Sequence, residues 1–215
     1  MAILPHILAV GDLHGRYDLL RKIFSQVLPG LPAGTRLIFL GDYIDRGPDS
    51  RVILEALMAY QALRPETVLL MGNHERMLLE ALEGRQVELF LANGGQETLR
   101  SFGLTMQTLH QIPAALLSFL RGLPLFHEEE QYIFVHAGLK PGLPLADQQE
   151  RDLLWIRDEF IHGQWDFGKT VVFGHTPFAE PLVKPGLIGI DTGAGFGLRL
   201  TCLKLPEREF IHVTT

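Results

Sequence analysis

Six short runs of apolar, strand-forming residues recur along the chain. Each is followed at once by Gly, Asp or His, and none continues into a longer apolar stretch. The runs occupy residues 7–10, 37–40, 67–71, 132–135, 170–173 and 187–190. Strands that are buried on both faces have near-continuous apolar sequences, so this pattern predicts sheets that are covered on both sides.

Helical periodicity separates the early strands. Residues 16–28 and 49–63 each carry apolar side chains at three- and four-residue spacing, and Pro48 suits the first turn of the second helix. Residues 76–123 are predicted to be mostly helical, with a break at Gly94 and Gly95. Alternating strands and helices indicate a layered α/β fold.

The last third of the chain predicts a more antiparallel sheet, with further strands at residues 198–205 and 209–213. Two mixed β-sheets flanked by helices, an αββα sandwich, would accommodate both halves. The 215 residues are enough for one sizeable core and too few for two. We therefore expect one catalytic domain over residues 1–215.

Composition narrows the function classes. The formal net charge is −6 and the pI is about 5.8, which gives no electrostatic basis for bulk nucleic-acid binding. The single cysteine, Cys202, excludes an internal disulfide. The N-terminus lacks the features of a signal peptide, and no apolar run reaches the roughly 20 residues that span a bilayer. A cytoplasmic protein without membrane contact is expected, whereas no feature indicates an oligomeric state.

Five short polar motifs stand directly after predicted strands. They are GDLHG (11–15), GDYIDRG (41–47), GNHE (72–75), HAG (136–138) and GHT (174–176). In layered α/β folds, ligands bind beyond the carboxyl ends of the strands. The five loops are therefore expected to converge on one site, with a dinuclear metal centre at the strand C-terminal ends.

The side chains in these motifs are chemically suited to a pair of metal ions. Two ions about 3.5–4 Å apart can hold the attacking and leaving oxygens of an in-line phosphoryl displacement. A mixed oxygen and nitrogen set without thiolates suits Mn, Fe or Zn. The candidate ligands are Asp12, His14, Asp42, Asn73, His136 and His175.

Three further motif residues have roles in such a displacement. Arg46 can bind the phosphate, and His74 can protonate the leaving oxygen as a general acid. Asp45 can orient the His74 imidazole and favour its charged form.

In this order the five motifs resemble the phosphoprotein phosphatase family of the calcineurin-like metallophosphoesterases, of the bacterial and lambda-phage type. The resemblance covers residues 8–196. It implies that Asp12, His14 and Asp42 hold a first metal, and that Asp42, Asn73, His136 and His175 hold a second. It also implies that Arg157, in the sequence LWIRD, is a second phosphate-binding arginine.

Two positions depart from that pattern. Many members carry Arg directly before GNHE, where this chain has Met71. The tyrosine and cysteine loop of the eukaryotic enzymes is absent, and residues 190–194 occupy the corresponding region. The resemblance therefore does not imply binding of eukaryotic regulatory subunits.

The resemblance implies a metal-dependent phosphomonoesterase that acts on phosphoserine and phosphothreonine in proteins, with phosphotyrosine as a further substrate. Attack by a metal-bridging hydroxide is expected, with two divalent ions, Mn before Fe or Zn. One alternative is hydrolysis of diadenosine tetraphosphate or another nucleotide polyphosphate. Asp45 favours the phosphomonoesterase, because symmetrical diadenosine hydrolases have a small residue there. A second alternative is a non-catalytic metal-binding interaction module, which the intact motifs disfavour.

Overall fold

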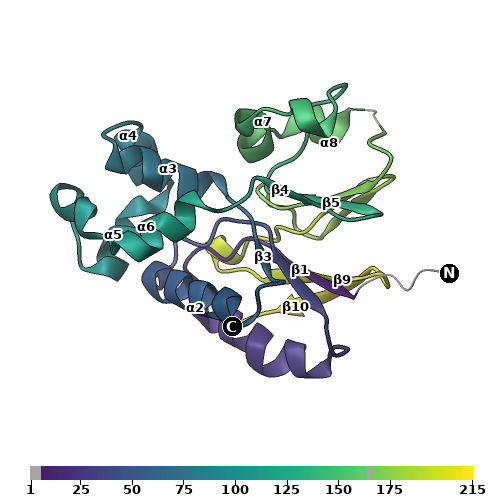
Figure 1. Cartoon of the computed structure of the whole chain (residues 1–215), viewed down its shortest axis with the longest axis horizontal. Helices are drawn as coiled ribbons and strands as arrows, with labels where there is room; N and C mark the ends of the chain where they lie inside the picture. Colours follow the sequence, from purple (N-terminus) through teal and green to yellow (C-terminus); the bar gives the residue numbers. More distant parts are fainter. Residues whose placement is uncertain (1–5, 164–165) are drawn as a thin grey trace.

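Two five-stranded sheets form the centre of the computed structural model, which describes residues 6–163 and 166–215 (Figure 1). The first sheet has the order β10-β9-β1-β2-β3, with β1, β2 and β3 parallel and β9 antiparallel to both β1 and β10. Its strands are β1 (Ile7–Val10), β2 (Arg36–Phe39), β3 (Val68–Leu69), β9 (Leu200–Leu205) and β10 (Glu209–Val213).

The second sheet has the order β4-β5-β6-β8-β7. Its three central strands, β5, β6 and β8, are parallel, and each edge strand is antiparallel to its neighbour. The strands are β4 (Phe126–Glu128), β5 (Tyr132–Val135), β6 (Thr170–Phe173), β7 (Leu182–Lys184) and β8 (Leu187–Gly189).

Helices cover the outer face of each sheet. On the side of the first sheet lie α1 (Tyr17–Lys22), α2 (Ser50–Leu63), α3 (Asn73–Leu82), α4 (Val87–Phe90), α5 (Gln96–Phe102) and α6 (Ala114–Arg121). The second sheet is covered by α7 (Glu150–Trp155) and α8 (Asp158–His162) (Figure 1). None of the helices in the described part of the chain is long and apolar enough to cross a membrane.

Strand alternation explains why the short runs are apolar throughout. In β1, Leu8 and Val10 face the helical layer, whereas Ile7 and Ala9 face the space between the sheets. Successive side chains point to opposite faces of a strand, so a strand with two covered faces needs an apolar residue at every position. The structure thus confirms the predicted αββα sandwich.

The last third of the chain is divided between the two sheets, and most of its strand pairs are antiparallel, as predicted. β9 pairs antiparallel with β1 and β10, and β7 with β8, whereas β6 pairs in parallel with β5 and β8. The strands β4 and β7 were not predicted. Each has only three residues at a sheet edge, where one side chain is exposed and the apolar signal is weak.

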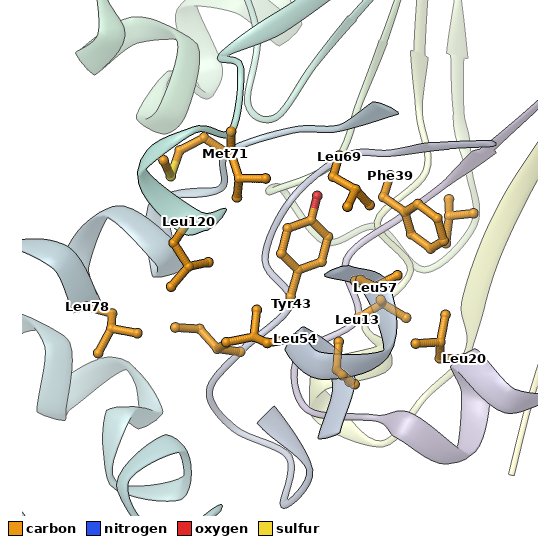
Figure 2. Packing of buried hydrophobic residues seen from close by; sticks show 14 of the residues in the cluster. Leu13, Leu20, Phe39, Tyr43, Leu54, Leu57, Leu69, Met71, Leu78 and Leu120 are labelled. Carbon is orange, nitrogen blue, oxygen red and sulfur yellow. The ribbon is translucent and has the colours of Figure 1, made fainter. Parts of the chain in front are cut away.

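Tyr43 anchors the loop after β2 in the core beneath it. Its ring is fully buried among apolar side chains such as Leu13, Leu54 and Leu69 (Figure 2). Its hydroxyl donates a hydrogen bond of 2.7 Å to the carbonyl oxygen of Leu70 at the end of β3. Because Tyr43 directly follows Asp42, this contact fixes the loop that carries a candidate ligand.

We expect Tyr43→Phe to lower the free energy of unfolding by about 1–2 kcal/mol, because the buried Leu70 carbonyl loses its side-chain donor. Urea titration followed by circular dichroism measures the change. Tyr60→Phe is the matched control, since the half-buried Tyr60 hydroxyl has no hydrogen-bond partner among the described residues. Equal stability of the two variants would contradict an anchoring role for the Tyr43 hydroxyl.

Candidate metal centre

The predicted ligand loops meet at the C-terminal ends of β1, β2, β3, β5 and β6. Two compact groups of potential metal ligands form there. In each group the ligand atoms all lie within 4.8 Å of one another. One contains His14, Asp42 and His74, and the other contains Asp42, His136 and His175. Asp42 belongs to both, which is the geometry that a bridging carboxylate requires.

Backbone strain is concentrated in these loops. Five polar residues of the motifs have positive φ angles, a conformation that costs side-chain-bearing residues free energy and that persists where the surrounding structure enforces it. They are His14 (φ 44°), Asp42 (φ 51°), Asp45 (φ 69°), Arg46 (φ 64°) and His175 (φ 61°). Such clustering is typical of functional sites.

Two histidines are oriented by main-chain carbonyl groups. His14 Nδ1 lies 2.9 Å from the oxygen of Ile44, and His136 Nδ1 lies 2.8 Å from that of Leu40. A carbonyl oxygen only accepts, so Nδ1 carries the proton in both rings. The Nε2 lone pairs therefore point into the site, as metal ligation requires.

Several of the ring nitrogens that face into the site lie against oxygen atoms and not against hydrogen-bond donors. His136 Nε2 lies 2.8 Å from Asn73 Oδ1 and 3.4 Å from Asp42 Oδ1. His175 Nδ1 lies 2.9 Å from the same Asn73 oxygen, while its Nε2 is buried and has no hydrogen-bond partner among the described residues. Converging lone pairs and an unpartnered imidazole nitrogen fit a divalent cation.

Electrostatics support the same conclusion. Burial lowers the pKa of His14 to about 3 and also lowers the pKa of His136 and of His175. These imidazoles are therefore neutral at pH 7, which is the form that binds metal. Burial and then the charges of Asp191 and Asp42 raise the pKa of Asp12, because three acidic side chains lie close together, and a bound cation would offset this repulsion.

Asp12 is placed differently from the other candidate ligands. It belongs to neither compact donor group of the described residues, and His74 stands in the first group instead. The Asp12 carboxylate accepts the backbone N–H of His175 at 3.0 Å. A Cβ on Gly174 would lie 2.1 Å from Asp12 Oδ1, so only glycine allows this approach.

The predicted acid pair is formed. His74 Nδ1 donates to Asp45 Oδ2 at 2.7 Å, and both side chains are buried. Burial alone would lower the pKa of His74, but the charges of Asp42 and Asp45 raise it. Two further residues that sequence reasoning missed hold Asp45. The Thr98 hydroxyl donates to Asp45 Oδ1 at 2.5 Å, and Ser50 accepts the Asp45 N–H at 3.1 Å.

Arg46 lies beside His14 and His74. Its guanidinium nitrogens lie 2.7 Å from His14 Nε2 and 3.2 Å from His74 Nε2. One face of the guanidinium stacks on the ring of Phe196, 4.5 Å from the centroid, and this ring is 60% exposed. A phosphate that enters the site would meet this planar group of donors.

Arg157 lies at the start of α8 and is exposed. Its charge contributes to the lowered pKa of His136 and of His175, after the larger effect of burial. The structure therefore brings Arg157 to the same region as these two candidate ligands.

Glu75 holds the motif loops together, a role that sequence reasoning missed although the residue belongs to GNHE. Its two carboxylate oxygens accept four backbone N–H groups, from Gly72, Asp42, Tyr43 and Ile44, at 2.8–3.2 Å. The loops after β2 and β3 are thereby joined through one buried side chain. The signal in the sequence was an acidic residue in the first turn of a helix that follows a glycine.

Comparison with known proteins gives one consistent family. The sequence model described as calcineurin-like phosphoesterase matches residues 5–198. The asymmetrical bis(5'-nucleosyl)-tetraphosphatases PrpE of Bacillus cereus and Bacillus thuringiensis are similar to this chain, each with 29% identity over 95% of it and 92% of their own length.

Solved structures share the fold at lower identity. A structure provisionally assigned as a diadenosine tetraphosphatase superposes with a TM-score of 0.75 and 24% identity, over 99% of this chain and 96% of that one. A protein serine/threonine phosphatase from Saccharomyces cerevisiae gives a TM-score of 0.67 and 15% identity, over 98% of this chain and 80% of that one. At these identities the likeness shows the fold alone.

We expect Glu75→Gln to reduce metal binding and to lower the free energy of unfolding by about 1–3 kcal/mol. The amide nitrogen of glutamine would face backbone N–H groups, which it cannot accept. Metal content after dialysis against Mn²⁺, together with thermal unfolding, measures both effects. Glu83→Gln, at the exposed end of α3, is the control. Wild-type metal content and stability in Glu75→Gln would refute the role assigned to this carboxylate.

Proposed function

The chain belongs to the calcineurin-like phosphoesterase family, and we propose that within this family of hydrolases it cleaves nucleoside polyphosphates of the dinucleoside tetraphosphate kind. The observation that carries the proposal is the end-to-end match to relatives that are named for this activity. Because the ligand loops come from both sheets, we also propose that residues 1–215 act as one catalytic domain.

The family uses a dinuclear divalent metal site, and the donors described above fit one. We propose that Asp12, His14 and Asp42 hold one ion, and that Asp42 also serves the second. The other ligands of the second ion would be Asn73, His136 and His175. Mn²⁺ suits this mixture of carboxylate, amide and imidazole. When bound, the two ions supply an activated water and neutralise charge on the phosphate.

The residues of the chain orient the phosphate. In our proposal Arg46 and Arg157 bind the non-bridging oxygens and hold the phosphorus in line with the attacking water. The position before GNHE contributes nothing to this, since Met71 is buried in the apolar core beneath the first sheet. Phosphate binding therefore depends on two arginines.

His74 completes the proposed reaction. The attacking water forms a new P–O bond and loses a proton to solvent, while the P–O bond to the leaving group breaks and leaves its electron pair on the leaving oxygen. His74 Nε2 donates a proton to that oxygen, while Nδ1–H stays bonded to Asp45. The Asp45 carboxylate stabilises the charged imidazole and keeps Nε2 aimed into the site.

A second candidate function is hydrolysis of phosphoserine and phosphothreonine in proteins. The observation in its favour is the 2.7 Å His74–Asp45 pair. An alkoxide leaving group needs a proton, whereas a polyphosphate leaves readily without one, so a well-built acid pair is more valuable for a phosphomonoester.

The reaction products distinguish the two functions, because the dinucleotide yields two nucleotides and the phosphoserine peptide yields inorganic phosphate. The metal-stripped protein is supplied with Mn²⁺ and given diadenosine tetraphosphate and a phosphoserine peptide in parallel. We expect a higher kcat/KM for the dinucleotide. A preference for the peptide would overturn the first proposal in favour of the second. Turnover of neither substrate, with metal bound, would reject both.

We expect His74→Asn to lower kcat for the phosphoserine peptide, whose alkoxide leaving group needs a proton, by about 10²–10⁴-fold, with little change in bound metal. Steady-state kinetics and metal analysis of the same preparation measure the two quantities. His110→Asn, on an exposed histidine, is the control. Because His74 also lies in the first donor group, a loss of metal in His74→Asn would identify it as a ligand and remove the acid assignment.

A further inference from the structure

A pocket of about 500 Å³ lies between α3 and α4 on one side and α7 on the other. We call it the α3–α7 pocket. In Figure 1 these helices belong to the opposite outer layers of the sandwich. Its volume is within the range of about 300–1,000 Å³ that is typical of sites for small molecules. Nothing in the mechanism proposed above uses it.

The α3–α7 pocket adjoins the metal centre. The indole of Trp155, in its wall, meets the ring of His175 edge to face, with centroids 6.1 Å apart. Arg76, in the opposite wall, stands two residues after His74 at the start of α3. A substrate whose phosphate lies at the metal centre could therefore extend directly into the pocket.

The pocket is lined by two positively and two negatively charged side chains, so its formal charge is zero. Arg76 and Arg151 are opposed by Glu80 and Glu150, and Arg76 Nε lies 2.7 Å from Glu150 Oε1. A pocket for a polyphosphate chain would carry a net positive charge. A balanced set of donors and acceptors suits a neutral, polar group.

The remaining wall is apolar and aromatic. Half-buried Trp155 lies in this wall, together with Leu89 of α4, which is 37% exposed. A nucleoside is neutral, planar and rich in hydrogen-bonding groups, and bases stack on aromatic side chains with a gain of about 1–3 kcal/mol each. A single peptide side chain would leave most of the volume empty.

We propose that the α3–α7 pocket binds one nucleoside of the substrate, with its base against Trp155. This inference rests on the proposed function and deepens it, since it assigns the group that distinguishes a nucleotide from other phosphoesters. Arg151 has no ion pair among the described residues and would contact a phosphate or ribose at the pocket edge.

The test compares two substrates in Mn²⁺-loaded protein. Diadenosine tetraphosphate fills both the metal centre and the pocket, whereas p-nitrophenyl phosphate has no nucleoside. We expect Trp155→Leu and Leu89→Asp each to lower the ratio of kcat/KM for the dinucleotide to that for the aryl phosphate about tenfold, chiefly through the KM of the dinucleotide. Leu63→Asp, on a leucine that is 80% exposed at the end of α2, should leave the ratio unchanged.

Adenosine provides a readout that does not depend on the variants. We expect it to compete with diadenosine tetraphosphate and not with p-nitrophenyl phosphate. Trp155→Leu could disturb His175 and weaken both reactions. In that case Leu89→Asp decides the outcome, because Leu89 has no interaction with the candidate ligands among the described residues.

Two failures are distinguishable. If the wild-type protein cleaves the dinucleotide but neither pocket variant changes the ratio, the pocket assignment is wrong and the proposed function stands. If the wild-type protein cleaves the aryl phosphate but not the dinucleotide, the proposed function is wrong and the pocket assignment falls with it.

Discussion

The position of the Asp42 carboxylate is the constraint on which the site depends. Its two oxygens serve both groups of donors, so a small displacement would disturb both at once. The backbone N–H of Asp42 donates to the Glu75 carboxylate. The Asp42 side chain in turn accepts the backbone N–H of His74 at Oδ1, at 3.1 Å. A Cβ on Gly72 would lie 2.2 Å from that oxygen, which leaves no side chain but hydrogen at this position. Asp42 therefore combines a charged side chain, a positive φ angle and a backbone neighbour that must be glycine.

The two-sheet architecture is what makes such a centre available. Asp12, His14 and Asp42 follow strands of the first sheet, while His136 and His175 follow strands of the second. The hydrogen bond from His136 to the Leu40 carbonyl crosses from one sheet to the other. The apolar layer between the sheets thus has a function beyond stability, because it fixes the distance between ligands from separate halves of the chain.

In the proposed function, the surroundings of the centre select the substrate. Arg46 and Arg157 would supply charge for a phosphate, and the α3–α7 pocket would supply a neutral and partly aromatic surface. The pocket lies between helices of the two outer layers, so its shape depends on how the sheets pack. Related chains can keep the same metal donors and differ in substrate when these outer helices differ.

The sequence by itself determined the layered fold and the loops that carry the candidate donors. Continuous apolar strands at residues 7–10 and 132–135, followed by Gly and by His, were enough to place the motif loops at strand ends. Only the tertiary structure decided the rest. Ser50 of α2 and Thr98 of α5 form hydrogen bonds with Asp45 in the loop after β2. The ring of Trp155, in α7, contacts the ring of His175 after β6. The pairing of β6 with β8 and the α3–α7 pocket likewise depend on which segments pack together. Local periodicity reports which residues are covered but not what covers them, and long-range contacts of this kind leave no pattern in a single sequence.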